Sequence, residues 1–230
     1  MTEFDPAWGV GLSFLFVFSI LGIGLGLFHF KIVDSFVSRK LIHIGVGHWW
    51  FFHLFLIKDP AWGLVGPFFF LGFNFLARQF GFLKAMEPGK GESNLGTIYF
   101  PMSLIALVAW CGWGGLPLWV AGVGIMVLSW GDGLAALMGR AWGRHPIPVA
   151  WTRKSWEGTM ALLVASFLVI LVCLFVFAAP LATYPLWWVT AVGKAVAIAL
   201  AVALVEALTP FGIDNLLLPV VVCGLLQLLV

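Results

Sequence analysis

The chain has 230 residues, of which 62% are hydrophobic and only 10% are charged. A soluble domain carries about 25% charged residues, so this composition excludes a soluble globular protein of this size. The net charge of +2 is too small to indicate a nucleic-acid partner. The three scattered cysteines argue against a disulfide framework, and we expect each of them to pack in the protein interior.

Eight apolar segments follow one another along the chain, each near the roughly 20 residues that a helix needs to cross a membrane. They cover residues 7–29, 41–57, 61–77, 96–112, 116–138, 157–179, 185–207 and 214–230. Because the apolar runs are continuous rather than alternating, we predict helices and not the strands of a barrel. The sequence therefore predicts an all-α polytopic integral membrane protein of about eight transmembrane helices, with one membrane domain over 1–230.

The basic residues orient this predicted bundle. Ten of the twelve Lys and Arg residues lie in three loops that alternating crossings place on one side: Lys31, Arg39 and Lys40, then Arg78, Lys84 and Lys90, then Arg140, Arg144, Arg153 and Lys154. Cytoplasmic loops are enriched in Lys and Arg. We therefore expect this side to be cytoplasmic and both termini to lie outside, in a bacterial-type inner membrane.

Five segments on the same predicted face carry the residues that we consider for the site. These segments are Arg39-Lys40 with His43, Gly91-Glu92-Ser93-Asn94 with Thr97, Gly131-Asp132-Gly133, the run from Arg153 to Thr159, and Glu206 with Asp214-Asn215. Acidic groups near the ends of apolar helices are costly unless they are paired, hydrated or bound to a metal. Carboxylates beside a basic cluster suit a polyphosphate bound with Mg²⁺, so we predict the active site at this face.

Asp132 is the strongest single candidate in this group. It follows an apolar run and lies between two glycines, which would let the backbone approach a ligand closely. A helix cap is the alternative interpretation of this residue, and a hydrogen-bonded interior histidine is the alternative for His43. The sequence has no P-loop and no nucleophile elbow, which excludes a soluble-type kinase.

The segment from Asp132 to Thr159 has a recognisable pattern. It reads Asp132-x-x-Ala135-x-x-x-Gly139-x-x-x-Gly143, then ten residues, then Lys154-Ser155-x-Glu157-Gly158-Thr159. This pattern resembles the CTP-binding motif of the CTP-dependent lipid kinases, which include dolichol kinase, phytol kinase and the fungal-type diacylglycerol kinase. The phosphatidate cytidylyltransferases carry a related segment, so this stretch alone does not separate the two enzyme classes.

Three further segments resemble the polyprenol and phytol kinases. They are Arg39-Lys40-Leu41-x-His43, then Asn94-Leu95-Gly96-Thr97 followed by Tyr99-Phe100-Pro101, and finally Glu206 with Asp214-Asn215-Leu216 through Pro219. The closing signature of the cytidylyltransferases, built around His-Gly-Gly and Asp-Arg, is absent. The resemblance covers residues 39–219, and residues 1–38 add the first span and a cytoplasmic loop.

One departure is Arg153-Lys154, where the family often has two lysines; Arg and Lys present their charge differently.

The resemblance implies Mg²⁺-dependent transfer of the γ-phosphoryl group of CTP to the hydroxyl of an isoprenoid or other lipid alcohol, such as a polyprenol, phytol or farnesol. Asp132 is the first candidate metal ligand, followed by Asp214 and Glu206. His43, Asp132 and Glu206 are the candidate catalytic bases, and the sequence does not choose among them. The expected nucleotide-binding residues are Arg39, Lys40, Asn94, Gly139, Gly143, Arg144, Arg153, Lys154, Ser155, Glu157, Gly158 and Thr159.

The expected partners are a lipid alcohol whose tail enters sideways from the bilayer, the nucleotide and the membrane lipids; a homodimer is left open. Two alternative functions remain at this point. The first is synthesis of a CDP-lipid by a cytidylyltransferase. The second is transport of an anionic substrate, which an inverted internal repeat would favour, but residues 1–115 and 116–230 show no such symmetry.

Overall fold

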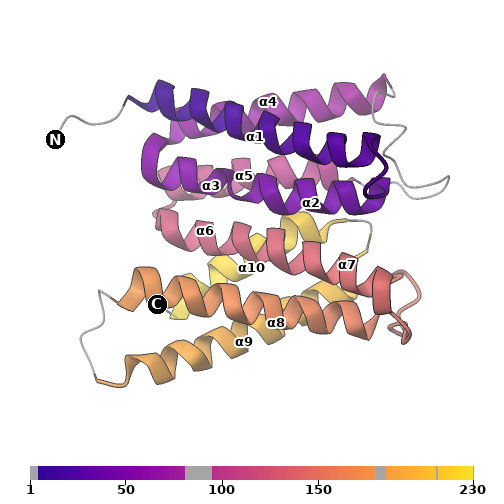
Figure 1. The fold of residues 1–230 in the computed structure, drawn as a ribbon. Helices are drawn as coiled ribbons and strands as arrows, with labels where there is room; N and C mark the ends of the chain where they lie inside the picture. The colour runs from indigo at the N-terminus through magenta and orange to yellow at the C-terminus, as the bar shows by residue number, and fades with distance from the viewer. Residues whose placement is uncertain (1–4, 81–94, 180–184, 211, 230) are drawn as a thin grey trace.

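The computed structural model describes residues 5–80, 95–179, 185–210 and 212–229. Within these ranges the chain is helical, and its β-structure is one isolated bridge between Pro146 and Ser155. The helices run side by side as one bundle (Figure 1). The prediction of an all-α membrane protein is confirmed.

The described elements are α1 (Pro6–His29), α2 (Ser35–Gly47), α3 (Trp49–Phe52), η1 (His53–Ile57), α4 (Pro60–Gln79), α5 (Gly96–Trp113), α6 (Leu118–Met126), η3 (Val127–Asp132), α7 (Gly133–Trp142), α8 (Trp156–Cys173), η4 (Leu174–Ala178), α9 (Trp187–Leu208) and α10 (Asp214–Leu229). The three η elements are π-helices, each continuous with an α-helix.

Six helical stretches of the described chain are long and apolar enough to cross a membrane. They are α1, α4, α5, the continuous α6–η3–α7, the continuous α8–η4, and α9. The two other predicted crossings correspond to shorter pieces: the broken stretch α2–α3–η1, which is interrupted at His48, and α10, which has 16 residues. The multi-pass architecture is thus confirmed, and the number of about eight crossings stays a prediction.

Several acidic residues outside the predicted site have a local structural role. Asp5, Asp34 and Asp59 precede α1, α2 and α4, and each side chain accepts a hydrogen bond from a backbone N–H of the first turn. Such caps satisfy donors that a helix start leaves without an internal partner. Proline at the first position supports α1 and α4 as well. These aspartates therefore start helices.

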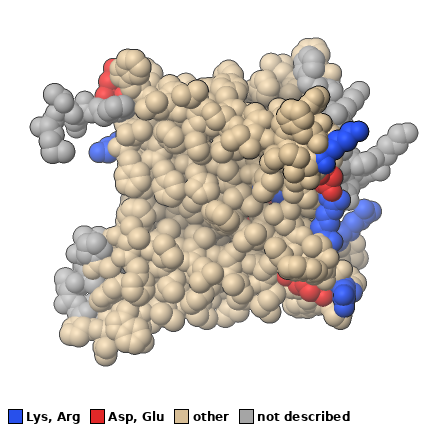
Figure 2. Space-filling view, in the orientation of Figure 1, with Lys and Arg blue, Asp and Glu red and all other residues tan. Residues whose placement is uncertain are grey.

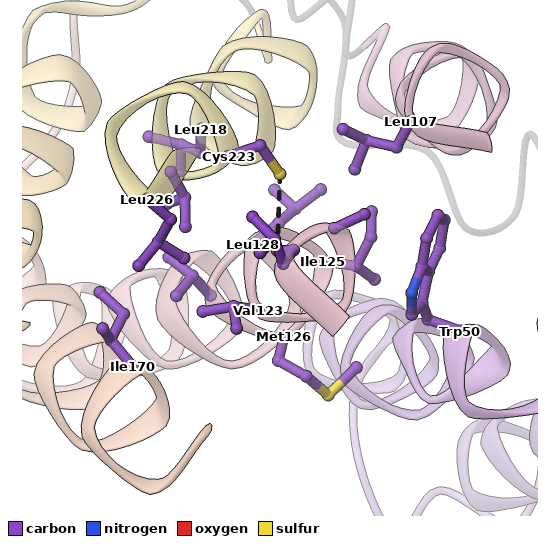
Figure 3. Close-up of a cluster of buried hydrophobic side chains, with 14 of the residues drawn as sticks. Trp50, Leu107, Val123, Ile125, Met126, Leu128, Ile170, Leu218, Cys223 and Leu226 are labelled. Carbon is purple, nitrogen blue, oxygen red and sulfur yellow. Dashed lines mark hydrogen bonds between the residues drawn. The ribbon is translucent and has the colours of Figure 1, made fainter. Parts of the chain in front are cut away.

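The stretch Leu118–Trp142, formed by α6, η3 and α7, is the centre of the bundle. In its most apolar 18-residue window 78% of the residues are buried inside the protein, whereas the share is 22–33% in the other long apolar helices. Leu218, Cys223 and Leu226 of α10 pack against it on one side, and the Cys223 thiol donates a hydrogen bond to the Val120 carbonyl (Figure 3). Cys111 and Cys173 pack against the same hydrophobic cluster, so the packing role predicted for the cysteines is confirmed.

Charged side chains gather at one end of the bundle (Figure 2). At that end, α2 begins, α7 ends, and the segment between α7 and α8 turns back (Figure 1). α1 begins and α10 ends at the opposite end. The segments that carry the predicted active-site residues therefore reach the same end of the bundle, although they are far apart in sequence.

Candidate active site

The first polar cluster joins α2 to the π-helix η3. The Lys40 Nζ lies 2.8 Å from the Asp132 Oδ2, and the His43 Nε2 lies 3.3 Å from the same oxygen. Lys40 and His43 are three residues apart on α2, so both side chains project from one face of the helix. Asp132 is only 7% exposed. A buried carboxylate requires a charged partner, and Lys40 provides it here.

Asp132 is the last residue of η3, and its side chain does not cap α7. The cap interpretation is therefore wrong for this residue. Its two flanking glycines have packing roles: a Cβ at Gly133 would overlap the Ile44 side chain of α2, and a Cβ at Gly131 would lie 3.0 Å from the Ser166 Oγ of α8. Short π-helical segments are frequent at functional sites, where they change the direction of the side chains.

The second polar cluster joins the segment before α8 to α9 and α10. The Lys154 Nζ lies 2.8 Å from the Asp214 Oδ2 and 3.0 Å from the Glu206 Oε1, and it also donates a hydrogen bond to the Glu206 carbonyl. The Thr159 hydroxyl donates to the other Glu206 carboxylate oxygen at 2.8 Å. Burial opposes the charged form of Lys154, but the two carboxylates outweigh it and raise the pKa of the ammonium above its usual value.

The segment between α7 and α8 holds Lys154 in place through backbone hydrogen bonds. The Ile147 N–H donates to the Lys154 carbonyl at 2.9 Å, and the Trp156 N–H donates to the His145 carbonyl at 3.0 Å. The Ser155 Oγ then accepts from the Gly158 N–H and starts α8. As a result, Lys154 reaches the carboxylates from a turn with defined geometry.

The glycines of the predicted nucleotide motif lie where α7 and α8 approach each other. A Cβ at Gly139 would lie 3.2 Å from the Ser155 Oγ, and a Cβ at Gly158 would lie 2.8 Å from the Ala135 carbonyl oxygen. At Gly143 a Cβ would overlap the Gly139 carbonyl. The structure thus gives these glycines a helix-packing role, and their predicted approach to a nucleotide stays a prediction.

The two polar clusters each join distant parts of the chain: Lys40 of the first pairs with Asp132, and Lys154 of the second pairs with Asp214. The helices that carry them are also in contact, since α10 packs against both η3 and α9. Three buried carboxylates, two lysines and His43 therefore form one polar region at the charged end of the bundle.

A cavity of about 590 Å³ opens beside the first cluster. It lies between α1, α2, α4 and α5, and its polar lining residues are Arg39, Lys40, His43, Asn74, Arg78, Thr97 and Asn215. Its other walls are formed mainly by apolar side chains, among them Val17, Leu21, Phe70, Phe100 and Leu104. This volume is within the usual range of small-molecule sites, and its combination of a polar mouth and an apolar interior suits an amphipathic ligand with a long hydrocarbon tail.

A phytol kinase of Synechocystis sp. is 35% identical to the chain over 222 residues, which cover 93% of this chain and 88% of that protein. The chain belongs to the phytol kinase family. Among further relatives of this family, a probable chloroplastic phytol kinase of Triticum aestivum is 29% identical over 82% of this chain and 66% of its own length. A probable chloroplastic phytol kinase 1 of Oryza sativa is 31% identical over 58% of this chain and 42% of its own length. No family model and no solved structure matches the chain.

Membership of the phytol kinase family makes the chain a kinase, and the resemblance predicted from the sequence is confirmed. Within this kinase, the structure brings together Lys40, His43 and Asp132 in one cluster and Lys154, Thr159, Glu206 and Asp214 in the other. Arg39 lines the cavity and lies over the Phe36 ring at 6.0 Å.

Other predicted residues lie outside the two clusters. Arg144 and Arg153 are exposed on the segment before α8. Glu157 is paired with His145 at 2.6 Å. Asn94 lies outside the described residues. The predicted nucleotide role of these residues remains untested.

Sequence reasoning missed Asn74 at the cavity mouth and gave Arg78 a role in orientation only. Asn74 and Arg78 of α4 line the cavity, and the Asn74 side chain donates a hydrogen bond to the Thr97 carbonyl at 2.8 Å. An asparagine inside an apolar span was the available signal, because such a residue faces the bundle interior more often than lipid. Asn215 also lines the cavity, and it follows Asp214 in the closing motif.

Two carboxylates of the second cluster have a suitable arrangement for a divalent cation. Within the described parts of the chain no three His, Cys, Asp or Glu side chains are close enough to hold a metal ion. The Glu206 Oε1 and the Asp214 Oδ2, however, converge on one ammonium. Mg²⁺ is commonly held by one or two carboxylates together with substrate phosphates and water. This pair therefore fits Mg²⁺ shared with a nucleotide, and the metal role of Asp132 stays a prediction.

Proposed function

We propose that this kinase transfers the γ-phosphoryl group of CTP to the hydroxyl of phytol or a related isoprenoid alcohol, with Mg²⁺, at the cytoplasmic surface of a bacterial-type inner membrane. The observation that carries the proposal is the cavity with Lys40 and His43 at its mouth. Burying an isoprenoid tail along the apolar walls is favourable because it removes apolar surface from water. The alcohol follows from the relatives' names, and CTP follows from the resemblance of the Asp132–Thr159 segment.

His43 is the best placed of the three candidate bases, because it lines the cavity whereas Asp132 and Glu206 do not. The two groups nearest its Nε2 are both acceptors: the Asp132 carboxylate at 3.3 Å and the Leu128 carbonyl at 3.4 Å. We therefore assign the ring proton to Nε2, which leaves Nδ1 as the nitrogen that can accept a proton from the alcohol. Asp132 would orient the ring and stabilise its charged form.

The two lysines suit the phosphate groups. Phosphoryl transfer depends mainly on positioning and on stabilising the negative charge of the moving group. Lys40 is next to His43 at the cavity mouth, so it would contact the transferred phosphoryl group. Lys154 would contact the rest of the triphosphate, with Glu206 and Asp214 as the Mg²⁺ ligands and Asp132 as a further candidate. Mg²⁺ bound there would neutralise charge on the phosphate oxygens.

Following the label of the nucleotide tests this reaction. Purified protein with Mg²⁺ and phytol should transfer label from γ-³²P-CTP into the lipid, while label from α-³²P-CTP should remain in soluble CDP. Transfer of the α label with release of pyrophosphate would replace the kinase proposal by CDP-lipid synthesis. A parallel reaction with γ-³²P-ATP tests the choice of base, and faster transfer from ATP would contradict CTP as the donor.

The orientation can be tested with single cysteines in a variant that lacks Cys111, Cys173 and Cys223. Ala150→Cys lies in an exposed part of the segment before α8, and Lys58→Cys is exposed between η1 and α4. A membrane-impermeant maleimide should label Ala150→Cys only in inverted vesicles and Lys58→Cys only in spheroplasts. The reverse pattern would show that the active site faces outward.

A further inference from the structure

The lining residues furthest from the charged end mark the inner end of the cavity. Each of its four helices contributes a deepest lining residue there: Val17 of α1, Trp49 of α3 following α2, Gly66 of α4 and Leu104 of α5. Three of these residues have buried side chains, with exposures of 2% for Val17, 3% for Trp49 and 5% for Leu104. The Trp49 indole is the largest of these side chains.

Gly66 allows the indole to lie across this end of the cavity. A Cβ at Gly66 would be 3.3 Å from the Trp49 Nε1 and 3.4 Å from its Cζ2, so the ring rests directly on the backbone of α4. Behind the indole lies the imidazole of His53, which is stacked on it with the ring centres 6.0 Å apart and is fully buried. A chain that reached Trp49 would therefore meet two stacked rings rather than an opening.

The depth of the cavity follows from helix geometry. Lys40 at the mouth and Trp49 at the inner end are nine residues apart, which corresponds to roughly 13 Å along a helix axis. On the opposite wall, Arg78 and Gly66 are twelve residues apart, or roughly 18 Å. This depth accommodates a terpenoid tail of a few isoprene units and is short of a long polyprenol.

We propose that Trp49 is a specificity-determining residue that sets the maximum length of the tail of the alcohol. The inference rests on the proposed function, because it assumes that the cavity holds the tail of the alcohol. A longer tail has to leave the cavity sideways or displace the indole, and either change exposes apolar surface or breaks packing. Leu104 of α5 also lies at the inner end, so enlarging it would shorten the cavity.

The test compares all-trans alcohols that increase by one isoprene unit: farnesol, geranylgeraniol and geranylfarnesol. Trp49→Leu should raise kcat/KM for geranylfarnesol relative to geranylgeraniol by roughly tenfold, which is the usual effect of a small change of volume in an apolar pocket. Leu104→Phe should shift the preference in the opposite direction, towards farnesol, by a similar factor. KM for CTP should stay the same in both variants, because neither residue takes part in the contacts of the polar clusters.

Trp50→Leu is the matched control. Trp50 is adjacent to Trp49 and fully buried, but it faces α6, where its Nε1 donates to the Leu118 carbonyl at 2.9 Å, and it does not line the cavity. An equal shift of chain-length preference in Trp50→Leu would overturn the inference, since general loosening of the helix packing would then explain the shift. If Trp49→Leu does not fold, Leu104→Phe carries the test.

The two proposals fail in different ways. If the wild-type protein phosphorylates none of the alcohols, the proposed function is wrong. If it phosphorylates them and the preference is unchanged in both Trp49→Leu and Leu104→Phe, the function stands and Trp49 does not set the chain length.

Discussion

Lys40 and Lys154 both contact buried carboxylates at the same end of the bundle, but their surroundings differ. Lys40 shares Asp132 with His43, and both Lys40 and His43 line the apolar cavity. Lys154 contacts Glu206 and Asp214 on helices that reach the cavity only through Asn215. The first cluster has one carboxylate and a histidine, which suits proton transfer from an alcohol. The second has two convergent carboxylates, which suit a metal–nucleotide complex.

This comparison indicates that two parts of one site act on different substrates. The cluster at the cavity mouth would act on the acceptor alcohol, and the cluster between α8, α9 and α10 would hold the phosphate donor. Variants of the first should therefore change turnover and the interaction with the alcohol. Variants of the second should change the requirements for Mg²⁺ and nucleotide.

The largest effect is expected for Asp132→Asn. The substitution preserves shape but removes the charge that pairs with Lys40 and orients His43. Turnover should fall by at least about 100-fold, the scale of losing one key electrostatic stabiliser. The measurement is kcat with γ-³²P-CTP and phytol. Turnover close to that of the wild type would mean that the cavity-mouth cluster is not catalytic.

Glu206→Gln should affect the second cluster without disturbing the first. Because an amide binds Mg²⁺ more weakly than a carboxylate, the Mg²⁺ concentration for half-maximal activity should rise by roughly 10-fold to 100-fold, the range that disturbed metal sites show. KM for phytol should remain unchanged, since Glu206 does not line the cavity. A change in the phytol KM with an unaltered Mg²⁺ requirement would contradict the division between the clusters.

Thr159→Val should impair the second cluster as well, but less than Glu206→Gln does. The substitution keeps the shape of the side chain and removes the hydroxyl that donates to Glu206 at 2.8 Å. Losing a hydrogen bond to a buried acceptor costs about 1–3 kcal/mol, so kcat/KM for CTP should fall by roughly tenfold. Thr159→Ser, which keeps the donor, is the control and should retain most of the activity. Equal losses in the two variants would point to packing instead of the hydrogen bond.

The smallest effect is expected for Asp34→Asn, which makes the same chemical change as Asp132→Asn at an exposed position. Asp34 caps α2 and pairs with Arg140 at 2.7 Å, and both side chains are about half exposed. The Val37 N–H and the Arg140 guanidinium hold the pKa of Asp34 below its usual value, so this pair is present at neutral pH and is lost only as the pH falls through that lowered pKa. Exposed ion pairs contribute little, and activity at neutral pH should change by less than about twofold. A loss comparable to that of Asp132→Asn would show that charge at this end matters irrespective of burial.

The sequence predicted the main candidates of the site because ionisable residues are costly in an apolar chain. Asp132, Glu206 and Asp214 stood out against their apolar surroundings, and the structure shows all three buried at one end of the bundle. Asp34 and Asp59 could not be separated from them on this basis, since a capping aspartate also precedes an apolar helix. Only the partner of each carboxylate distinguishes a cap from a site residue.

The roles of the glycines and of the aromatic residues were harder to predict. Gly139 and Gly158 match a nucleotide motif in the sequence, but they lie where α7 and α8 touch, a contact that requires the two helix axes to be known. Trp49 belongs to an aromatic run, and neither its type nor its spacing distinguishes it from Trp50. The direction of each side chain depends on the break in the helix at His48, which the sequence does not reveal.

The sequence by itself determined the membrane class, the helical architecture and the charged end, because hydropathy and charge act over each segment independently of its neighbours. Tertiary structure alone decided which lysine pairs with which carboxylate, because those contacts join residues that are 52 to 92 positions apart. It also decided the existence and depth of the cavity. A cavity is the space that four packed helices leave between them, so it depends on their relative positions and on no single segment.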